Sequence, residues 1–104
     1  MTDDIEQKGW LALEFLRKTD DEHATLEREA KRAEHRYKKT IDAQFMVIPG
    51  AVEVRKTAAR LEAEPLYIDF LDTQAKADAI RNKRDTAQAT IDYVRTIMAN
   101  RRMG

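Results

Sequence analysis

The chain has 104 residues, of which 37% are charged and 42% are hydrophobic, and its 19 basic and 19 acidic side chains give a net charge of zero. A chain of this length forms one domain at most, and balanced charge argues against a protein that coats nucleic acid through bulk positive charge. Three glycines and two prolines supply too few tight turns for a β-sandwich or barrel. The apolar residues recur at fixed spacing, which argues against disorder. We therefore expect a single all-α domain over residues 1–104.

The first expected element is a long helix over residues 3–46, with an apolar seam along one side. The segment from Thr19 to Glu22 could instead be a capping box that starts a second helix. No glycine or proline accompanies the threonine, so one continuous helix is favoured. The seam residues, separated alternately by four and three positions, are Ile5, Gly9, Ala12, Leu16, Thr19, His23, Leu26, Ala30, Ala33, Tyr37 and Thr40.

A break follows at Pro49-Gly50, where two residues that interrupt helices stand side by side. Residues 51–63 are expected to form a short helical middle segment between the ends of two arms. Pro65 suits the first turn of a new helix, because its missing N–H is not needed there. The middle segment therefore leads into a last arm over residues 65–101.

The last arm carries the clearest heptad seam of the chain. A seam of this length requires a packing partner along the helix. Arg84 occupies one of its positions, where it could fix the register and oligomeric state or extend from the seam edge toward solvent. The seam residues are Leu66, Phe70, Thr73, Ala77, Ile80, Arg84, Ala87, Ile91, Val94 and Met98.

The two seams predict a coiled-coil-like antiparallel hairpin, because each arm alone would expose its apolar side. In the expected core, residues of the last arm (Leu66, Phe70, Ile80, Ile91, Val94 and Met98) face residues of the first (Leu13, Leu16, Leu26, Tyr37 and Ile41).

Several large apolar residues lie outside both seams and predict a homodimer, in which two hairpins complete a four-helix bundle. Arg84 would then pair with an acid across the interface. Phe45 also lacks an expected partner. The candidate interface residues are Trp10, Phe15, Tyr67, Leu71, Tyr93 and Ile97.

Catalytic and metal motifs are weak. Asp20 and His23 have the acid-x-x-His spacing of helical di-metal sites, but such sites also need carboxylates on facing helices. No phosphate loop or nucleophile elbow occurs, and the chain lacks cysteine. We expect no metal, no cofactor and no enzyme activity.

The basic residues form three groups that could contact nucleic acid or a partner. A basic row on a helix can follow a phosphate backbone. The alternative is a mixed-charge solvated face, because Glu27, Glu29 and Glu34 interleave with the first group. The candidate contacts are Arg28, Lys31, Arg32, His35 and Lys39, then Arg81 and Arg84, then Arg101 and Arg102.

Three stretches carry a resemblance. Residues 8–20 (KGWLALEFLRKTD), the middle from Glu53 to Tyr67, and the closing segments 80–87 (IRNKRDTA), 91–95 (IDYVR) and 100–102 (NRR) resemble small, mostly uncharacterised helical proteins of tailed phages and prophages. Some of those proteins are encoded among early replication and recombination genes. The resemblance implies an accessory role in phage DNA metabolism, or a factor acting on a host machine. It transfers no functional residue.

Together these patterns favour a non-enzymatic interaction protein that acts in DNA replication or recombination through an unknown phage or host protein. One alternative is direct DNA binding through the basic face from Arg28 to Lys39. Another is inhibition of a host defence or regulatory protein. The acidic N-terminus lacks the apolar core of a signal peptide, and no apolar run approaches the ~20 residues that span a bilayer. We expect a cytoplasmic protein without membrane association.

Overall fold

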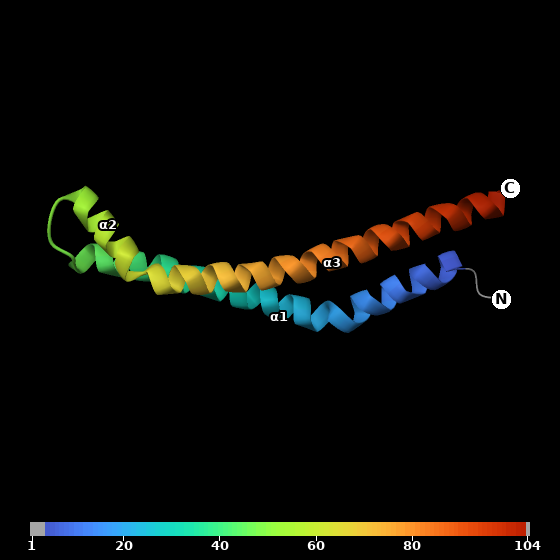
Figure 1. Cartoon of the computed structure of the whole chain (residues 1–104), viewed down its shortest axis with the longest axis horizontal. Coiled ribbons are helices and arrows are strands. Elements are labelled where there is room, and N and C mark those ends of the chain that lie inside the picture. The colour runs from blue at the N-terminus through green and yellow to red at the C-terminus, as the bar shows by residue number, and fades with distance from the viewer. Residues whose placement is uncertain (1–3, 104) are drawn as a thin grey trace. The chain divides into compact units, whose positions relative to one another are not determined.

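The computed structural model describes residues 4–103, which form three helices and no strand. They are α1 (Asp4–Val47), α2 (Val52–Glu62) and α3 (Glu64–Met103) (Figure 1). The predicted all-α class is confirmed, and the expected arms and middle segment agree with the helix bounds to within two residues.

Helix α1 continues through the point where a capping box was considered. The Thr19 hydroxyl donates a hydrogen bond of 2.7 Å to the carbonyl of Phe15, four residues earlier in the same helix. A threonine that caps a helix accepts from a backbone N–H further along the chain, whereas this one bonds back into the preceding turn. The continuous first helix is therefore confirmed, and the capping-box alternative is wrong.

The connection after α1 depends on Gly50. Its φ of 120° lies in the region that only glycine adopts without strain. Pro65 lies in the first turn of α3, as expected. Between these two points, α2 ends at Glu62, and the backbone N–H of its C-cap residue Ala63 donates to the carbonyl of Ala59 at 3.1 Å.

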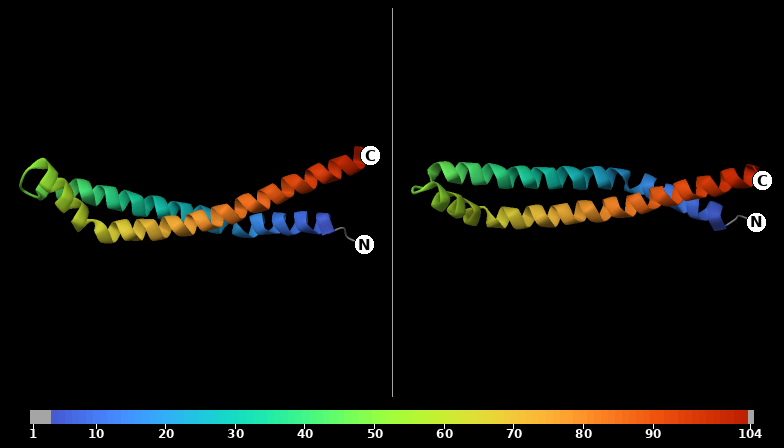
Figure 2. Two further views of the ribbon diagram at one scale, coloured as in Figure 1. Left: turned by 45° about the horizontal axis from the view of Figure 1, so that its top comes forward. Right: turned by 90° about the horizontal axis from the view of Figure 1, so that it is seen from above.

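Packing divides the chain into two units, and both long helices contribute to each. Unit 1 comprises residues 1–24 and 78–104, and unit 2 comprises residues 25–77. Within each unit, segments of α1 and α3 run side by side in opposite directions (Figure 2). The antiparallel helical hairpin is thus confirmed, whereas the single domain over residues 1–104 stays a prediction.

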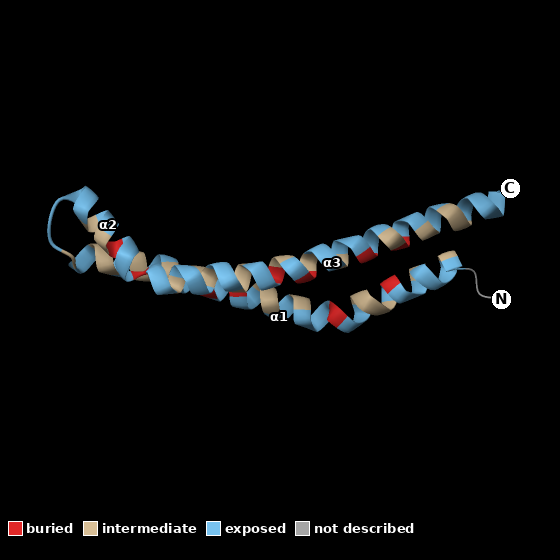
Figure 3. Cartoon of the chain, in the orientation of Figure 1, coloured by how far each residue is buried: buried red, intermediate tan, exposed pale blue. Residues whose placement is uncertain are grey.

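Both predicted seams are confirmed, because no residue of either one is exposed. In α1 and α3 every buried position is a seam residue, and Ala59 of α2 and its C-cap residue Ala63 are buried as well (Figure 3). Most of them are small. Unit 1 buries Ala12, Thr19, Ile80, Ala87 and Ile91, and unit 2 buries Ala30, Ala33, Ala59, Ala63 and Ala77.

One expected core residue is placed differently. Leu13 is 43% exposed, because the seam contact at this turn is made by its neighbour Ala12. The other expected core positions are buried or half-buried.

Unit 2 holds a cluster of aromatic rings between α1 and α3. The ring of Tyr37 lies 5.0 Å from that of Tyr67 and 6.4 Å from that of Phe70, measured between centroids. Such distances are typical of favourable aromatic pairs. Tyr67 therefore has partners within the chain, contrary to expectation.

Arg55 joins α2 to the end of α1. Its guanidinium donates to the carbonyl of Phe45 at 2.6 and 3.2 Å and lies 4.2 Å from the centre of the Phe45 ring. That carbonyl belongs to the last turn of α1, where backbone acceptors have no partner within the helix and a cation is favoured. Phe45 was expected to lack a partner, and that expectation is wrong.

Candidate interaction surfaces

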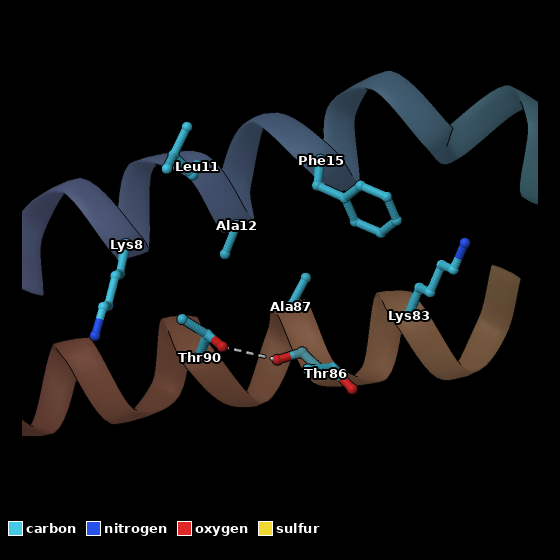
Figure 4. Close-up of a pocket in the computed structure, with 8 residues that line it drawn as sticks. All are labelled: Lys8, Leu11, Ala12, Phe15, Lys83, Thr86, Ala87 and Thr90. Atoms are coloured by element: carbon cyan, nitrogen blue, oxygen red, sulfur yellow. Dashed lines mark hydrogen bonds between the residues drawn. The ribbon is translucent and has the colours of Figure 1, made fainter.

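An open groove runs between α1 and α3 in unit 1 (Figure 4). Its volume is about 520 Å³. In the close-up, Ala12 and Ala87 point toward the opposite helix, and Phe15 projects from α1 toward α3. The lining residues are Lys8, Leu11, Ala12, Phe15, Lys83, Thr86, Ala87 and Thr90.

Small seam residues create this groove. A Cβ atom added at Gly9 would lie 3.0 Å from Cγ1 of Val94, so the two helices approach closely at this turn. Ala12 and Ala87 are too short to fill the adjoining space. Phe15 packs against their cluster but is only partly buried, and Leu11 stays 58% exposed. The groove is therefore mainly apolar and accessible.

Two threonines on the α3 side use their hydroxyl hydrogens within their own helix. Thr86 donates to the carbonyl of Asn82 at 3.1 Å, and Thr90 donates to the carbonyl of Thr86 at 3.0 Å. These bonds leave the threonines without a donor for the groove. The remaining polar groups are the ammonium groups of Lys8 and Lys83, and over residues 4–103 the structure gives neither one an ion pair.

Sequence reasoning missed most of this groove. Leu11 and Phe15 are four residues apart beside the seam, and Lys83, Thr86 and Thr90 follow one another at spacings of three and four. This spacing could have marked two facing flanks. It could not have shown that they enclose a groove, because that depends on how the helices align.

Arg84 occupies a seam position of α3, and its guanidinium forms hydrogen bonds with α1 in unit 1. Its Nη1 donates to the Leu16 carbonyl and the Thr19 hydroxyl, both at 2.8 Å, and its Nη2 lies 3.3 Å from Oδ1 of Asp20. Arg84 therefore pairs with an acid of its own chain, and its pairing across a dimer interface stays a prediction. With 17% of its side chain exposed, Arg84 has little surface for an external partner.

The candidate interface residues are divided between the two units. Trp10 and Tyr93 in unit 1 are 56% and 61% exposed, and Leu71 in unit 2 is also exposed. Ile97 is half-buried. Phe15 and Tyr67 have the intrachain partners described above.

The first basic group forms an exposed row on α1 in unit 2, on the side opposite the seam. Its members are Arg28, Lys31, Arg32, His35 and Lys39, all exposed.

No member of this row has an ion pair among the residues that the structure describes, although Arg28 lies 3.4 Å from the Thr25 hydroxyl. One interleaved acid, Glu34, pairs instead with Lys38 at 3.3 Å.

The other two basic groups are separate. Arg81 pairs with Asp78 at 3.1 Å, and Arg101 and Arg102 are exposed in the last turn of α3. Cations at that position favourably oppose the helix dipole.

Within residues 4–103, no group of three or more metal-ligating side chains is placed to hold a metal ion. None of the three helices, over the part described, has the length and apolarity needed to span a bilayer. Comparison with protein-family models, curated proteins and solved structures gives no match to this chain.

Proposed function

We propose that this chain is a non-enzymatic helical interaction protein that binds a protein partner through unit 1. The observation that carries the proposal is the exposure of large apolar side chains beside a seam that is already packed. Trp10, Leu11 and Tyr93 are each more than half exposed. The contact between α1 and α3 does not bury them, so intrachain packing does not account for their presence.

The residue types support a role in recognition. Tryptophan and tyrosine are enriched among the residues that contribute most to protein–protein binding. Here Leu11 also lines a groove large enough to receive side chains of a partner. Unit 1 therefore offers both exposed anchors and a receiving surface.

The biological setting of the proposal comes from the resemblance to helical proteins of tailed phages. We propose an accessory role in phage DNA replication or recombination, carried out in the host cytoplasm. The identity of the partner separates this role from inhibition of a host protein. A phage replication or recombination protein supports the first role, and a host defence or regulatory protein supports the second.

Site-specific photocrosslinking tests the interaction. A photoreactive phenylalanine analogue replaces Tyr93 in one variant and Gln88 in a matched control. Both positions are exposed and lie on α3 in unit 1, and their separation of five residues places them about 140° apart around the helix axis. We expect one protein to be crosslinked at position 93 and not at position 88. Equal labelling at both positions, or labelling at neither, contradicts the proposal.

Homodimerisation is the simplest form of such an interaction and stays a prediction. Light scattering at micromolar concentration measures it directly. A mass near 12.1 kDa corresponds to one chain and would exclude the dimer, whereas about twice that value supports it. A crosslink from position 93 to a second copy would place the dimer interface on unit 1.

Direct nucleic-acid binding is the second candidate, favoured by the exposed basic row on α1. Residues 25–40 contain six Lys or Arg against three Glu, although the whole chain is neutral. A row of cations that contacts phosphates releases counterions, so its affinity falls steeply as salt rises.

Gel-shift titrations at two salt concentrations test this candidate. Replacing Arg28 and Arg32 by Gln should lower the affinity and reduce the salt slope by about 1 for each phosphate that is no longer neutralised. Replacing Lys18 and Lys76 by Gln removes the same charge at exposed positions outside the candidate contacts and serves as the control. An affinity that does not depend on salt would exclude the basic row as a phosphate-binding site.

A further inference from the structure

The groove in unit 1 combines apolar lining with two exposed ammonium groups. Its α1 side carries Leu11 and Phe15, and none of the described residues that line it is acidic. Lys8 and Lys83 also line it, and the structure assigns neither an ion pair over residues 4–103. An occupant that covers the apolar surface therefore gains from carrying carboxylates where it meets these two ammonium groups.

The two lysines lie toward opposite ends of the groove. Figure 4 shows Lys8 on α1 opposite Thr90, and Lys83 on α3 near Phe15. Lys8 and Phe15 are seven residues apart on one helix, as are Lys83 and Thr90 on the other. Seven residues are two helical turns, or about 10 Å. The positive charges thus bracket an apolar stretch of about two turns.

A helix suits this groove better than an extended segment. The groove lies between two packed helices, whose backbone N–H and C=O groups are bonded within each helix. An extended peptide would find no backbone partners there and would leave its own polar groups unpaired. The backbone hydrogen bonds of a helix are formed within the helix itself, and an amphipathic helix can pack its apolar side into the groove.

A second copy of the chain that docked by the same groove would be opposed by charge. A two-fold contact places the same surface patch on both sides. The lysines of both copies would then gather around one apolar stretch with no acid among the lining residues. The charge pattern therefore favours a different protein with acidic character.

We propose that the groove of unit 1 binds an amphipathic helix of a protein partner, whose apolar stripe covers Ala12, Phe15 and Ala87 and whose carboxylates pair with Lys8 and Lys83. The two acids lie seven residues apart on the partner helix, with apolar residues three and four positions after the first. This inference rests on the proposed function and specifies the chemistry of the partner.

Fluorescence anisotropy with designed peptides tests it on the full chain. The probe is a labelled alanine-based peptide of about sixteen residues, cross-linked on its outer face because short helices are marginal in water. It carries Glu at positions i and i+7 and Leu at i+3 and i+4. The matched peptide has Lys in place of both Glu residues. We expect the Glu peptide to bind about tenfold more tightly than the Lys peptide.

Charge-reversed variants locate the site. In the double variant Lys8→Glu, Lys83→Glu, we expect the preference to invert, so that the Lys peptide binds more tightly. The double variant Lys31→Glu, Lys39→Glu changes the net charge equally on exposed positions of unit 2 and should keep the wild-type preference. All four positions are exposed and outside the seams, and circular dichroism verifies that each variant stays helical.

Three results would overturn the inference. They are equal affinity of the two peptides for the wild-type chain, the same reduction of affinity in both double variants, and no binding of either peptide up to millimolar concentration. Failure of this inference remains distinguishable from failure of the proposed function. A partner crosslinked at position 93 but unaffected by Lys8→Glu and Lys83→Glu keeps the function and rejects the groove. Peptide binding without any crosslinked partner would support the groove as a helix-binding site and reject the proposed function.

Discussion

Units 1 and 2 have the same heptad spacing but fill it with different side chains. Unit 1 buries Ile80 and Ile91 beside alanines, and a half-buried arginine bonds across its two helices. Unit 2 buries only alanines, from 0% to 2% exposed, and adds α2 and an aromatic cluster. The comparison shows that small seam residues have two outcomes. They are closely covered in unit 2, whereas in unit 1 they leave an open groove.

The largest effect is expected from removing a branched side chain in unit 1. Ile91→Ala should lower the free energy of unfolding by about 2–5 kcal/mol, because it loses buried apolar surface and leaves a cavity. Leu26→Ala in unit 2 should cost less, since Leu26 is only half-buried. Urea denaturation measures both. Losses well below ~1 kcal/mol for both Ile80→Ala and Ile91→Ala would contradict the seam register.

Enlarging an alanine tests whether the two units differ in free space. Ala33, which is 1% exposed, has no room for a larger side chain, so Ala33→Leu should destabilise the chain by about 1–3 kcal/mol. Ala12 lines the groove, and Ala12→Leu should cost less because the added carbons can occupy the groove. Thermal unfolding compares the stabilities of the two variants. Equal losses of stability would mean that the groove has no room for the added side-chain atoms.

Arg84 tests the polar contribution to unit 1. Arg84→Met keeps most of the apolar stem but removes the bonds to Leu16, Thr19 and Asp20. We expect a loss of about 1–2 kcal/mol, because hydrogen bonds from a charged group are worth more than neutral ones.

The Asp20 contact contributes little to that loss, because its carboxylate is 76% exposed. Arg84→Lys should recover only part of the stability, since an ammonium group lacks the forked donors of a guanidinium. Equal stability of the Met variant and the wild type, measured by urea denaturation, would show that these bonds are not net stabilising.

The smallest effects concern single polar links in unit 2. Arg55→Met removes the cation from the Phe45 carbonyl and ring and should cost about 0.5–1.5 kcal/mol. Asp69→Asn weakens the ion pair between Asp69 and Arg36. Both side chains are about half exposed, so the loss of stability should be less than about 0.5 kcal/mol. Thermal unfolding ranks the two variants. The reverse order would mean that α2 is not held by Arg55.

The expected interface illustrates how far pattern reasoning reaches. Trp10, Leu71 and Tyr93 lie outside the seams and are exposed, as their spacing predicts. Phe15 and Tyr67 also lie outside the seams, yet both have partners in the chain. Long aromatic side chains reach around the edge of a helix to a neighbour. Position on one helix is therefore an incomplete guide to which of the largest residues have partners in the chain.

The sequence by itself determined the three helices, the break at Pro49-Gly50 and both seams. These features follow from local chemistry, because apolar spacing and helix-breaking residues act within a few positions of the chain. Only the tertiary structure decided which residues meet across the helices. Arg84 bonds to residues 64 to 68 positions earlier, and the groove combines α1 with a distant part of α3. The axial alignment of two helices depends on the sum of many weak seam contacts. Residue spacing along one helix does not predict that alignment.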